Sequence, residues 1–95
     1  MALDRRIKTV TCTDEREEHF AHRGIDLGDI HAVCTGEIVI ARARDGCHVV
    51  LGLDDNGRYL AIVVVLEMKG RARVITAREM DKKECRRYRA IKRNV

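Results

Sequence analysis

The chain of 95 residues is long enough for one domain with a single modest core, and it contains no proline and only three aromatic residues. Its longest apolar run, Tyr59–Leu66, has eight residues, which excludes a membrane-spanning helix. The first residues, MALDRRIK, lack the apolar segment of a signal peptide. We therefore expect one domain over residues 1–95, in the cytoplasm and without a membrane partner.

The positive charge is concentrated at the C-terminal end. Residues 78–95 hold eight Lys or Arg and three acidic residues, a net charge of +5, whereas the other 77 residues hold eleven bases and twelve acids, a net charge of −1. A local positive surface can attract a phosphate backbone or an acidic protein. The ordinary alternative is a solvated surface helix.

The N-terminal third predicts one strand and two helices. The β-branched segment Ile7–Cys12 favours a short strand. Residues 14–23 begin with several acids, as helices often do, and the helix should stop at Gly24. Asp26 is a good N-cap for a second helix over Leu27–Cys34, whose apolar residues form one stripe.

The rest of the chain predicts four strands and a basic helix. The strands are Glu37–Ala43, Cys47–Leu53, Arg58–Leu66 and Ala72–Ala77, and the helix is Arg78–Lys92. The third strand is apolar on both sides, so it should be central and covered on both faces. Short turns make neighbouring strands antiparallel. The class is therefore α+β, with a mainly antiparallel sheet of four or five strands, two N-terminal helices and one basic C-terminal helix.

A narrow apolar stripe should dock the last helix on the sheet. Met80, Glu84, Tyr88, Ile91 and Val95 fall within about a quarter of the helical circumference. Glu84 is the acid in this stripe. It is either the partner of a nearby arginine or a functional carboxylate.

A resemblance to a known family rests on motifs spread over roughly residues 14–89. They are Leu51-Gly52, Gly57-Arg58-Tyr59-Leu60, the valine-rich strand, Val74-Ile75-Thr76-Ala77-Arg78-Glu79-Met80, Glu84 and Arg87-Tyr88. In these the chain resembles the BrnT family, toxins of bacterial toxin–antitoxin pairs with a RelE-like fold. The segment Glu18–Ile25 is similar to the first helix of that family.

The resemblance implies a metal-independent endoribonuclease that needs no cofactor and blocks translation. Its substrate would be RNA, and its partner would be a DNA-binding antitoxin that holds it inactive. The RNA 2′-OH can attack the adjacent phosphate if a base takes its proton, an acid protonates the leaving oxygen and cations stabilise the phosphorane. An apolar edge strand could be covered by the antitoxin or by a second copy of the chain in a homodimer.

Candidate site residues follow from the matched positions. Arg58, Arg78, Glu84 and Tyr88 keep the motif, while His22-Arg23 stands where the family commonly has Lys/Arg-His, and the Trp-Asp expected near the start is replaced by Thr11-Cys12. The candidate catalytic residues are His22, Arg23, Arg58, Arg78, Glu84 and Tyr88. The candidate RNA-binding residues are Lys82, Lys83, Arg86 and Arg87, and no metal ligands are expected.

Each candidate also has a structural interpretation. Arg78 can pair with Glu84, Arg58 can be surface charge, Tyr88 can belong to the core and His22 can bond a carbonyl at the helix end. The alternative function is a catalytically inactive BrnT-like module that binds protein or nucleic acid. The ribonuclease hypothesis predicts that Arg23, Arg58 and Arg78 converge beside His22, whereas the binding module predicts scattered basic residues with no histidine near them.

Overall fold

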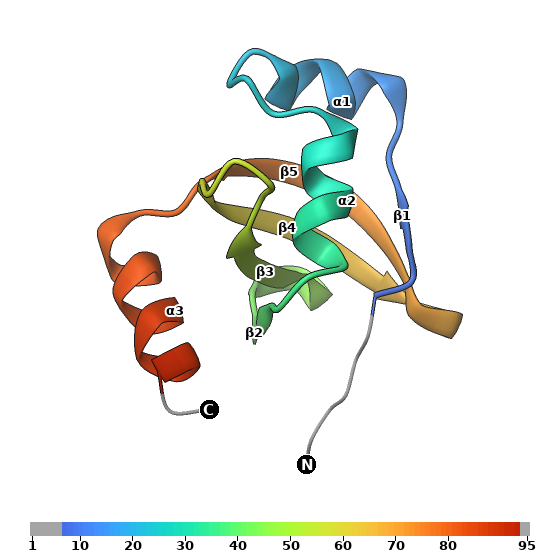
Figure 1. The fold of residues 1–95 in the computed structure, drawn as a ribbon. Helices are drawn as coiled ribbons and strands as arrows, with labels where there is room; N and C mark the ends of the chain where they lie inside the picture. Colours follow the sequence, from blue (N-terminus) through green and yellow to red (C-terminus); the bar gives the residue numbers. More distant parts are fainter. Residues whose placement is uncertain (1–6, 94–95) are drawn as a thin grey trace.

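The computed structural model describes residues 7–93 and has one five-stranded sheet with three helices, an α+β fold as expected (Figure 1). The elements are β1 Thr9–Thr11, α1 Asp14–Ala21, α2 Leu27–Cys34, β2 Val39–Arg42, β3 His48–Leu53, β4 Tyr59–Glu67, β5 Arg71–Glu79 and α3 Lys82–Arg93. None of the helices in this part of the chain combines the length and apolar character needed to cross a bilayer.

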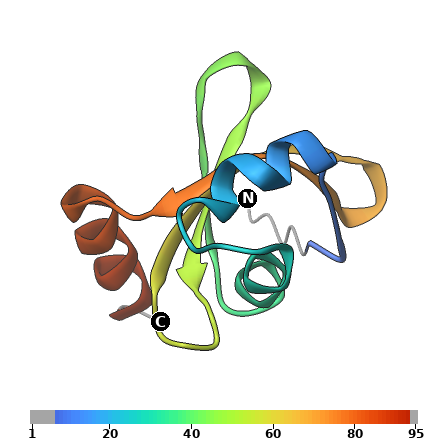
Figure 2. The same ribbon diagram turned by 90° about the horizontal axis from the view of Figure 1, so that it is seen from above.

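The sheet is mixed, with the strand order β1-β5-β4-β3-β2. β2 to β5 pair as antiparallel neighbours, as the short turns require. β1 joins β5 in parallel, with Thr9 opposite Arg71 and Thr11 opposite Arg73. A strand was predicted over Ile7–Cys12, but its parallel pairing with β5 was not. The hairpin between β2 and β3 projects away from the helices (Figure 2).

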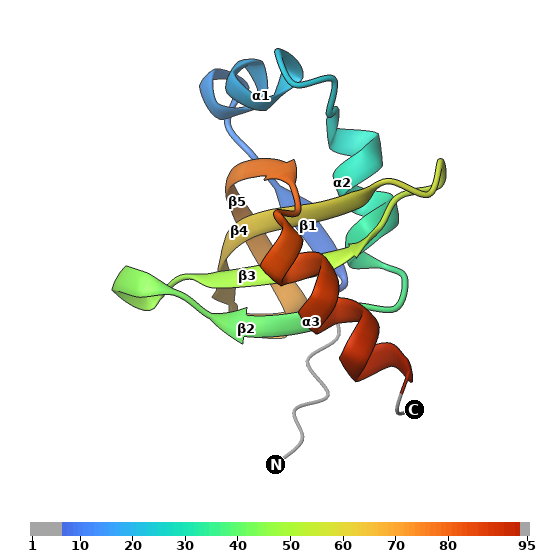
Figure 3. The ribbon, with the colours of Figure 1, turned by 90° about the vertical axis from the view of Figure 1, so that its left-hand side faces the viewer.

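Two separate cores cover the two faces of the sheet. α1 and α2 bring Phe20, Ile30 and Val33 against Ile62 and Val64, and all five are fully buried. α3 lies on the opposite face, in front of the sheet in Figure 3. The smaller core on this face contains Leu51, Ala61, Met80 and Tyr88. The expected two-sided burial of the central strand is thus confirmed from Leu60 to Ile62, where β4 is buried throughout.

α3 begins four residues later than predicted. Arg78 lies within β5, opposite Ala61 of β4. The helix starts after Asp81, where the Asp81 carboxylate accepts the Glu84 N–H at 2.8 Å and the Glu84 carboxylate accepts the Asp81 N–H at 3.0 Å. This reciprocal pair is a capping box, and it fixes the start of α3 at Lys82.

The docking stripe of α3 is shorter than the periodicity predicts. Met80 is buried but precedes the helix, Tyr88 is buried, and Ile91 is 39% exposed. Val95 lies outside the described residues. Cys85 packs beside Tyr88 against the smaller core. The contact of α3 with the sheet is therefore concentrated in its first two turns.

Gly52 marks a close approach between β3 and the α2 side of the fold. A Cβ at this position would lie 2.9 Å from Val33 Cγ1 and 3.3 Å from Ile38 Cγ2. We predict that Gly52→Ala lowers the free energy of unfolding by about 1–3 kcal/mol, because the packed neighbours must move. Gly36→Ala is the matched control: its nearest contact would be 3.4 Å, so it should stay within about 0.5 kcal/mol of wild type. Equal urea midpoints for the two variants would contradict the prediction.

Candidate functional site

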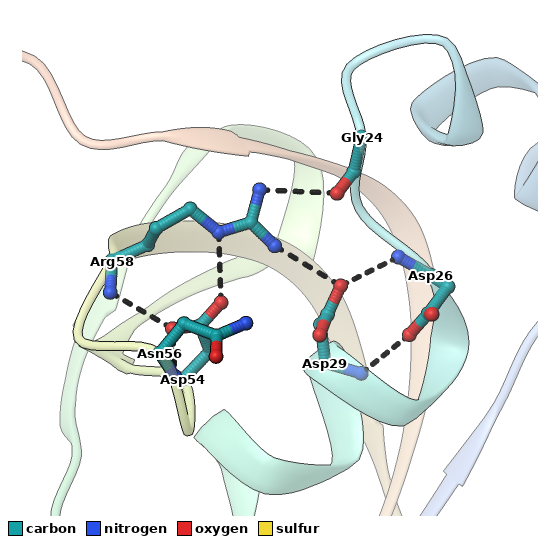
Figure 4. Close-up of polar contacts among 6 residues, drawn as sticks. All are labelled: Gly24, Asp26, Asp29, Asp54, Asn56 and Arg58. Carbon is teal, nitrogen blue, oxygen red and sulfur yellow. Dashed lines mark hydrogen bonds and ion pairs between the residues drawn. The ribbon is translucent and has the colours of Figure 1, made fainter.

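Arg58 connects three parts of the fold through one guanidinium group (Figure 4). Its Nε donates to Asp54 Oδ2 at 2.8 Å, its Nη2 to Asp29 Oδ2 at 3.1 Å and its Nη1 to the Gly24 carbonyl oxygen at 3.0 Å. These acceptors belong to the β3–β4 turn, the first turn of α2 and the loop after α1. The geometry favours the structural interpretation of Arg58 over a catalytic one.

Asp54 is the buried acceptor of this cluster, and its side chain is 0% exposed. Its carboxylate accepts the backbone N–H groups of Asn56 at 2.9 Å and Arg58 at 2.8 Å, as well as Arg58 Nε. Burial raises the pKa of Asp54, but these bonds and the Arg58 charge outweigh burial and hold the pKa below its ordinary value. Asp54 was not predicted as a key residue, although an aspartate that begins a turn commonly bonds the following N–H groups.

Arg78 and Glu84 form a two-pronged ion pair between the end of β5 and the start of α3. The Arg78 Nη1 and Nη2 atoms lie 2.6 and 2.9 Å from the two carboxylate oxygens of Glu84. The hydrogen bond from Arg78 lowers the pKa of Glu84. A carboxylate kept ionised in this way is a poor proton donor near neutral pH. The pairing that the sequence left open as an alternative is therefore present.

Tyr88 ties α3 to the segment that precedes β2. Its hydroxyl donates to the Glu37 carbonyl oxygen at 2.9 Å, and its ring meets Tyr59 edge-on at a centroid distance of 6.0 Å. Burial raises the pKa of Tyr88. The phenol is thus buried and already hydrogen-bonded, which favours packing over proton transfer.

Arg23 and Arg16 bond the backbone along the edge of β5. Arg16 Nη1 donates to the Ile75 carbonyl oxygen at 3.2 Å, and Arg23 Nη1 donates to the Ala77 carbonyl oxygen at 2.8 Å. β1 pairs only with residues 71–73, so the carbonyls beyond them have no strand neighbour on that side in the described sheet. The two arginines satisfy this edge. Arg16 was missed by sequence reasoning because its partner lies 59 residues away.

His22 is the candidate catalytic residue whose side chain makes no hydrogen bond to the described part of the protein, residues 7–93. It lies at the end of α1 and is exposed. His19, three residues earlier in the same helix, is exposed as well. Gly24, with φ of 74°, ends this helix as expected, since Ile25 N–H and Gly24 N–H bond back to the carbonyls of Phe20 and Ala21.

The three candidate arginines do not converge. Arg23 donates to the Ala77 carbonyl oxygen and Arg58 to the Gly24 carbonyl oxygen, both on the side of the fold that holds α1 and α2. Arg78 follows Ala77 in β5, and adjacent strand residues point to opposite faces of a sheet. Arg78 therefore points to the α3 face, where it pairs with Glu84. Within the described chain, no group of three or more His, Cys, Asp or Glu is arranged to hold a metal ion.

Four basic residues in the first half of α3 are exposed. Lys82, Lys83, Arg86 and Arg87 all extend into solvent, and no ion pair joins any of them to an acid in the described part of the chain. The cations predicted from the sequence as RNA contacts are therefore accessible to a large anion.

Removing the Arg58 side chain should destabilise the fold. We predict that Arg58→Ala lowers the free energy of unfolding by about 2–3 kcal/mol, because the Asp54 carboxylate loses a charged donor while it stays buried. Urea unfolding measures this change. Arg44→Ala is the control, since Arg44 is exposed and should cost no more than about 0.5 kcal/mol. Similar losses of unfolding free energy for both variants would contradict a stabilising role of the Arg58 contacts.

Asp54 should give stability a specific dependence on pH. Its folded pKa lies below the ordinary value of 3.8, so its contribution is present above that value and is lost as the pH falls through the folded pKa. Asp54→Asn cannot titrate, so we predict a stability gap to wild type that is largest near neutral pH and narrows below 3.8. The exposed Asp55→Asn variant controls for removal of one charge. A gap that stays constant with pH would contradict this prediction.

Comparison of the chain with family models, with curated proteins and with solved structures finds no match. The function has to be argued from the arrangement of its own side chains.

Proposed function

We propose that this protein is an RNA-directed toxin of the BrnT kind, a metal-independent endoribonuclease that acts in the cytoplasm and inhibits translation. The observation that carries the proposal is the exposed set of cations on α3, which have no acidic partner among the described residues. Cations gathered on one helix while the rest of the chain is slightly acidic suit a phosphate backbone.

The proposed chemistry uses the RNA itself as nucleophile. The 2′-OH loses its proton to a base and attacks the adjacent phosphorus, the bond to the 5′-oxygen breaks, and that oxygen takes a proton as a 2′,3′-cyclic phosphate forms. We assign one of the proton transfers to the exposed imidazole of His22. Arg23 beside it bonds the protein through Nη1 alone within residues 7–93, which leaves its other N–H groups for a phosphate.

The partner of such a toxin would be a DNA-binding antitoxin. β2 pairs with β3 alone in the described sheet, so its outer backbone groups are open for strand addition. The antitoxin, or a second copy of the chain in a homodimer, can cover this edge.

A second candidate function is a module that binds RNA without cleaving it. Two findings favour it. The three candidate arginines do not converge, as the binding module predicts. Arg58, Arg78, Glu84 and Tyr88 are all held by protein groups, and Arg23 bonds the edge of β5. Five of the six candidate catalytic side chains therefore have a structural role that would persist without catalysis.

Induced expression in a bacterium distinguishes the two functions. We predict growth arrest with fragmented RNA for wild type and for His31→Ala, and a loss of RNA cleavage of about 100-fold or more for His22→Ala. His31 is the matched control because it is also exposed near a helix end. Circular dichroism of the purified variants checks that all are folded.

Two results would overturn parts of this proposal. Unchanged cleavage by His22→Ala would remove His22 from the reaction. RNA binding by folded wild type without arrest or cleavage would establish the binding module instead.

A further inference from the structure

A groove with a volume of about 540 Å³ runs along one side of α3. Lys82, Arg86 and Arg89 line it, with Met80, Cys85 and Ala90 as its less polar surface. The three cations are spaced i, i+4 and i+7, so they form one row that spans about 10 Å along the helix axis. The groove thus presents a line of positive charge.

α3 also carries a second row of cations outside the groove. Lys83 and Arg87 are four residues apart, as Lys82 and Arg86 are, and all four side chains are exposed. Lys83 and Arg87 do not line the groove. The helix therefore has two pairs of the same composition and spacing, of which one faces the groove.

Arg89 is held in position at the groove by an aromatic side chain. Its guanidinium carbon lies 5.0 Å from the centre of the Tyr59 ring, and its Nε donates to the Tyr59 hydroxyl at 3.4 Å. The Tyr59 ring is in turn fixed edge-on by the buried Tyr88. Arg89 is thus pre-organised, and the ordering cost of binding an anion there is reduced.

We infer that the groove holds a single strand of RNA, with its phosphates along the row Lys82, Arg86 and Arg89. The inference rests on the proposed RNA-directed function. A row of cations along a groove suits one strand, because positively charged grooves follow the backbone of single-stranded nucleic acids. A double-stranded A-form helix has a deep, narrow major groove that protein helices do not enter.

The acid in the groove limits the path of the strand. Asp81 lies at the start of α3 and its carboxylate is already used as the helix cap. A negative charge at this end repels phosphate, so the strand should approach Lys82 from the side of Arg86.

Two double variants, each lacking one lysine and one arginine of α3, test where the RNA strand lies. Lys82→Gln/Arg86→Gln removes the groove pair, and Lys83→Gln/Arg87→Gln removes the outer pair from the same helix. Fluorescence anisotropy with a labelled single-stranded RNA of about 12 nucleotides, long enough to extend past both ends of the row, measures affinity over a salt series. The same RNA annealed to its complement tests strand preference.

We expect the groove variant to bind the single strand about tenfold more weakly at low salt. Loss of two phosphate contacts should also flatten the slope of log K against log salt by about 1.4. The outer variant should lose less than half as much on both measures, and the duplex should bind more weakly than the single strand. Both pairs are exposed, so both variants should stay folded.

Three outcomes would overturn the inference. Equal losses for the two variants would mean attraction by the whole helix. Tighter binding of duplex through the groove pair would exclude the single strand. Wild type that ignores RNA but binds a polyglutamate peptide through the groove pair would make it a site for an acidic protein. If either of the first two results is found but RNA cleavage still depends on His22, the proposed function stands and only the groove placement is lost. If RNA binds through the groove pair but is not cleaved, the groove placement stands and only the catalytic function is lost.

Discussion

The buried carboxylate of Asp54 is the constraint on which the α1–α2 side of the fold depends. A charge without water is costly unless several donors surround it, and Asp54 has three N–H donors within 2.9 Å. Two of these belong to Arg58, its backbone N–H and its Nε, and the Nη groups of the same residue reach Gly24 and Asp29. The same side chain therefore neutralises the buried charge and joins the sheet to both N-terminal helical segments.

The two faces of the sheet are attached by different forces. α1 and α2 cover a broad apolar core whose buried residues include members of β3, β4 and β5. α3 has the smaller core and is fastened by directional contacts, the Arg78–Glu84 pair and the bond from Tyr88 to Glu37. Arg78, Glu84 and Tyr88 are catalytic candidates by motif alone. In the structure they attach α3, a helix with little apolar surface, to the rest of the fold.

The sequence allowed most local features to be predicted and few of the long-range ones. The helix end at Gly24 and the N-cap at Asp26 depend on neighbouring residues, and the structure contains both. The parallel pairing of β1 with β5 and the partners of Arg58, 29 and 34 residues away, depend on tertiary packing. Arg78 looked like the start of a helix because its charge resembles that of the residues that follow, but strand pairing extends to Glu79.

The exposed cations of α3 were predicted as a set, but their division into two rows was not. Helical spacing alone places Lys82 with Arg86 and Lys83 with Arg87. Which row borders a groove depends on how Tyr88 and Cys85 dock the helix, and the predicted docking stripe wrongly included Ile91, which is exposed. The candidate site was therefore predictable in its residue types and only partly in its geometry.

The arginines that bond the edge of β5 have a consequence for how this sheet can grow. At that end Arg16 and Arg23 occupy the free carbonyls, and β1 is only three residues long, too short to template another strand. Growth by strand addition is thus confined to β2 at the opposite edge. Two copies of a sheet that is open at a single edge can join through that edge, and the resulting dimer has no open edge left. A fibre requires each copy to have an open edge on both sides of its sheet.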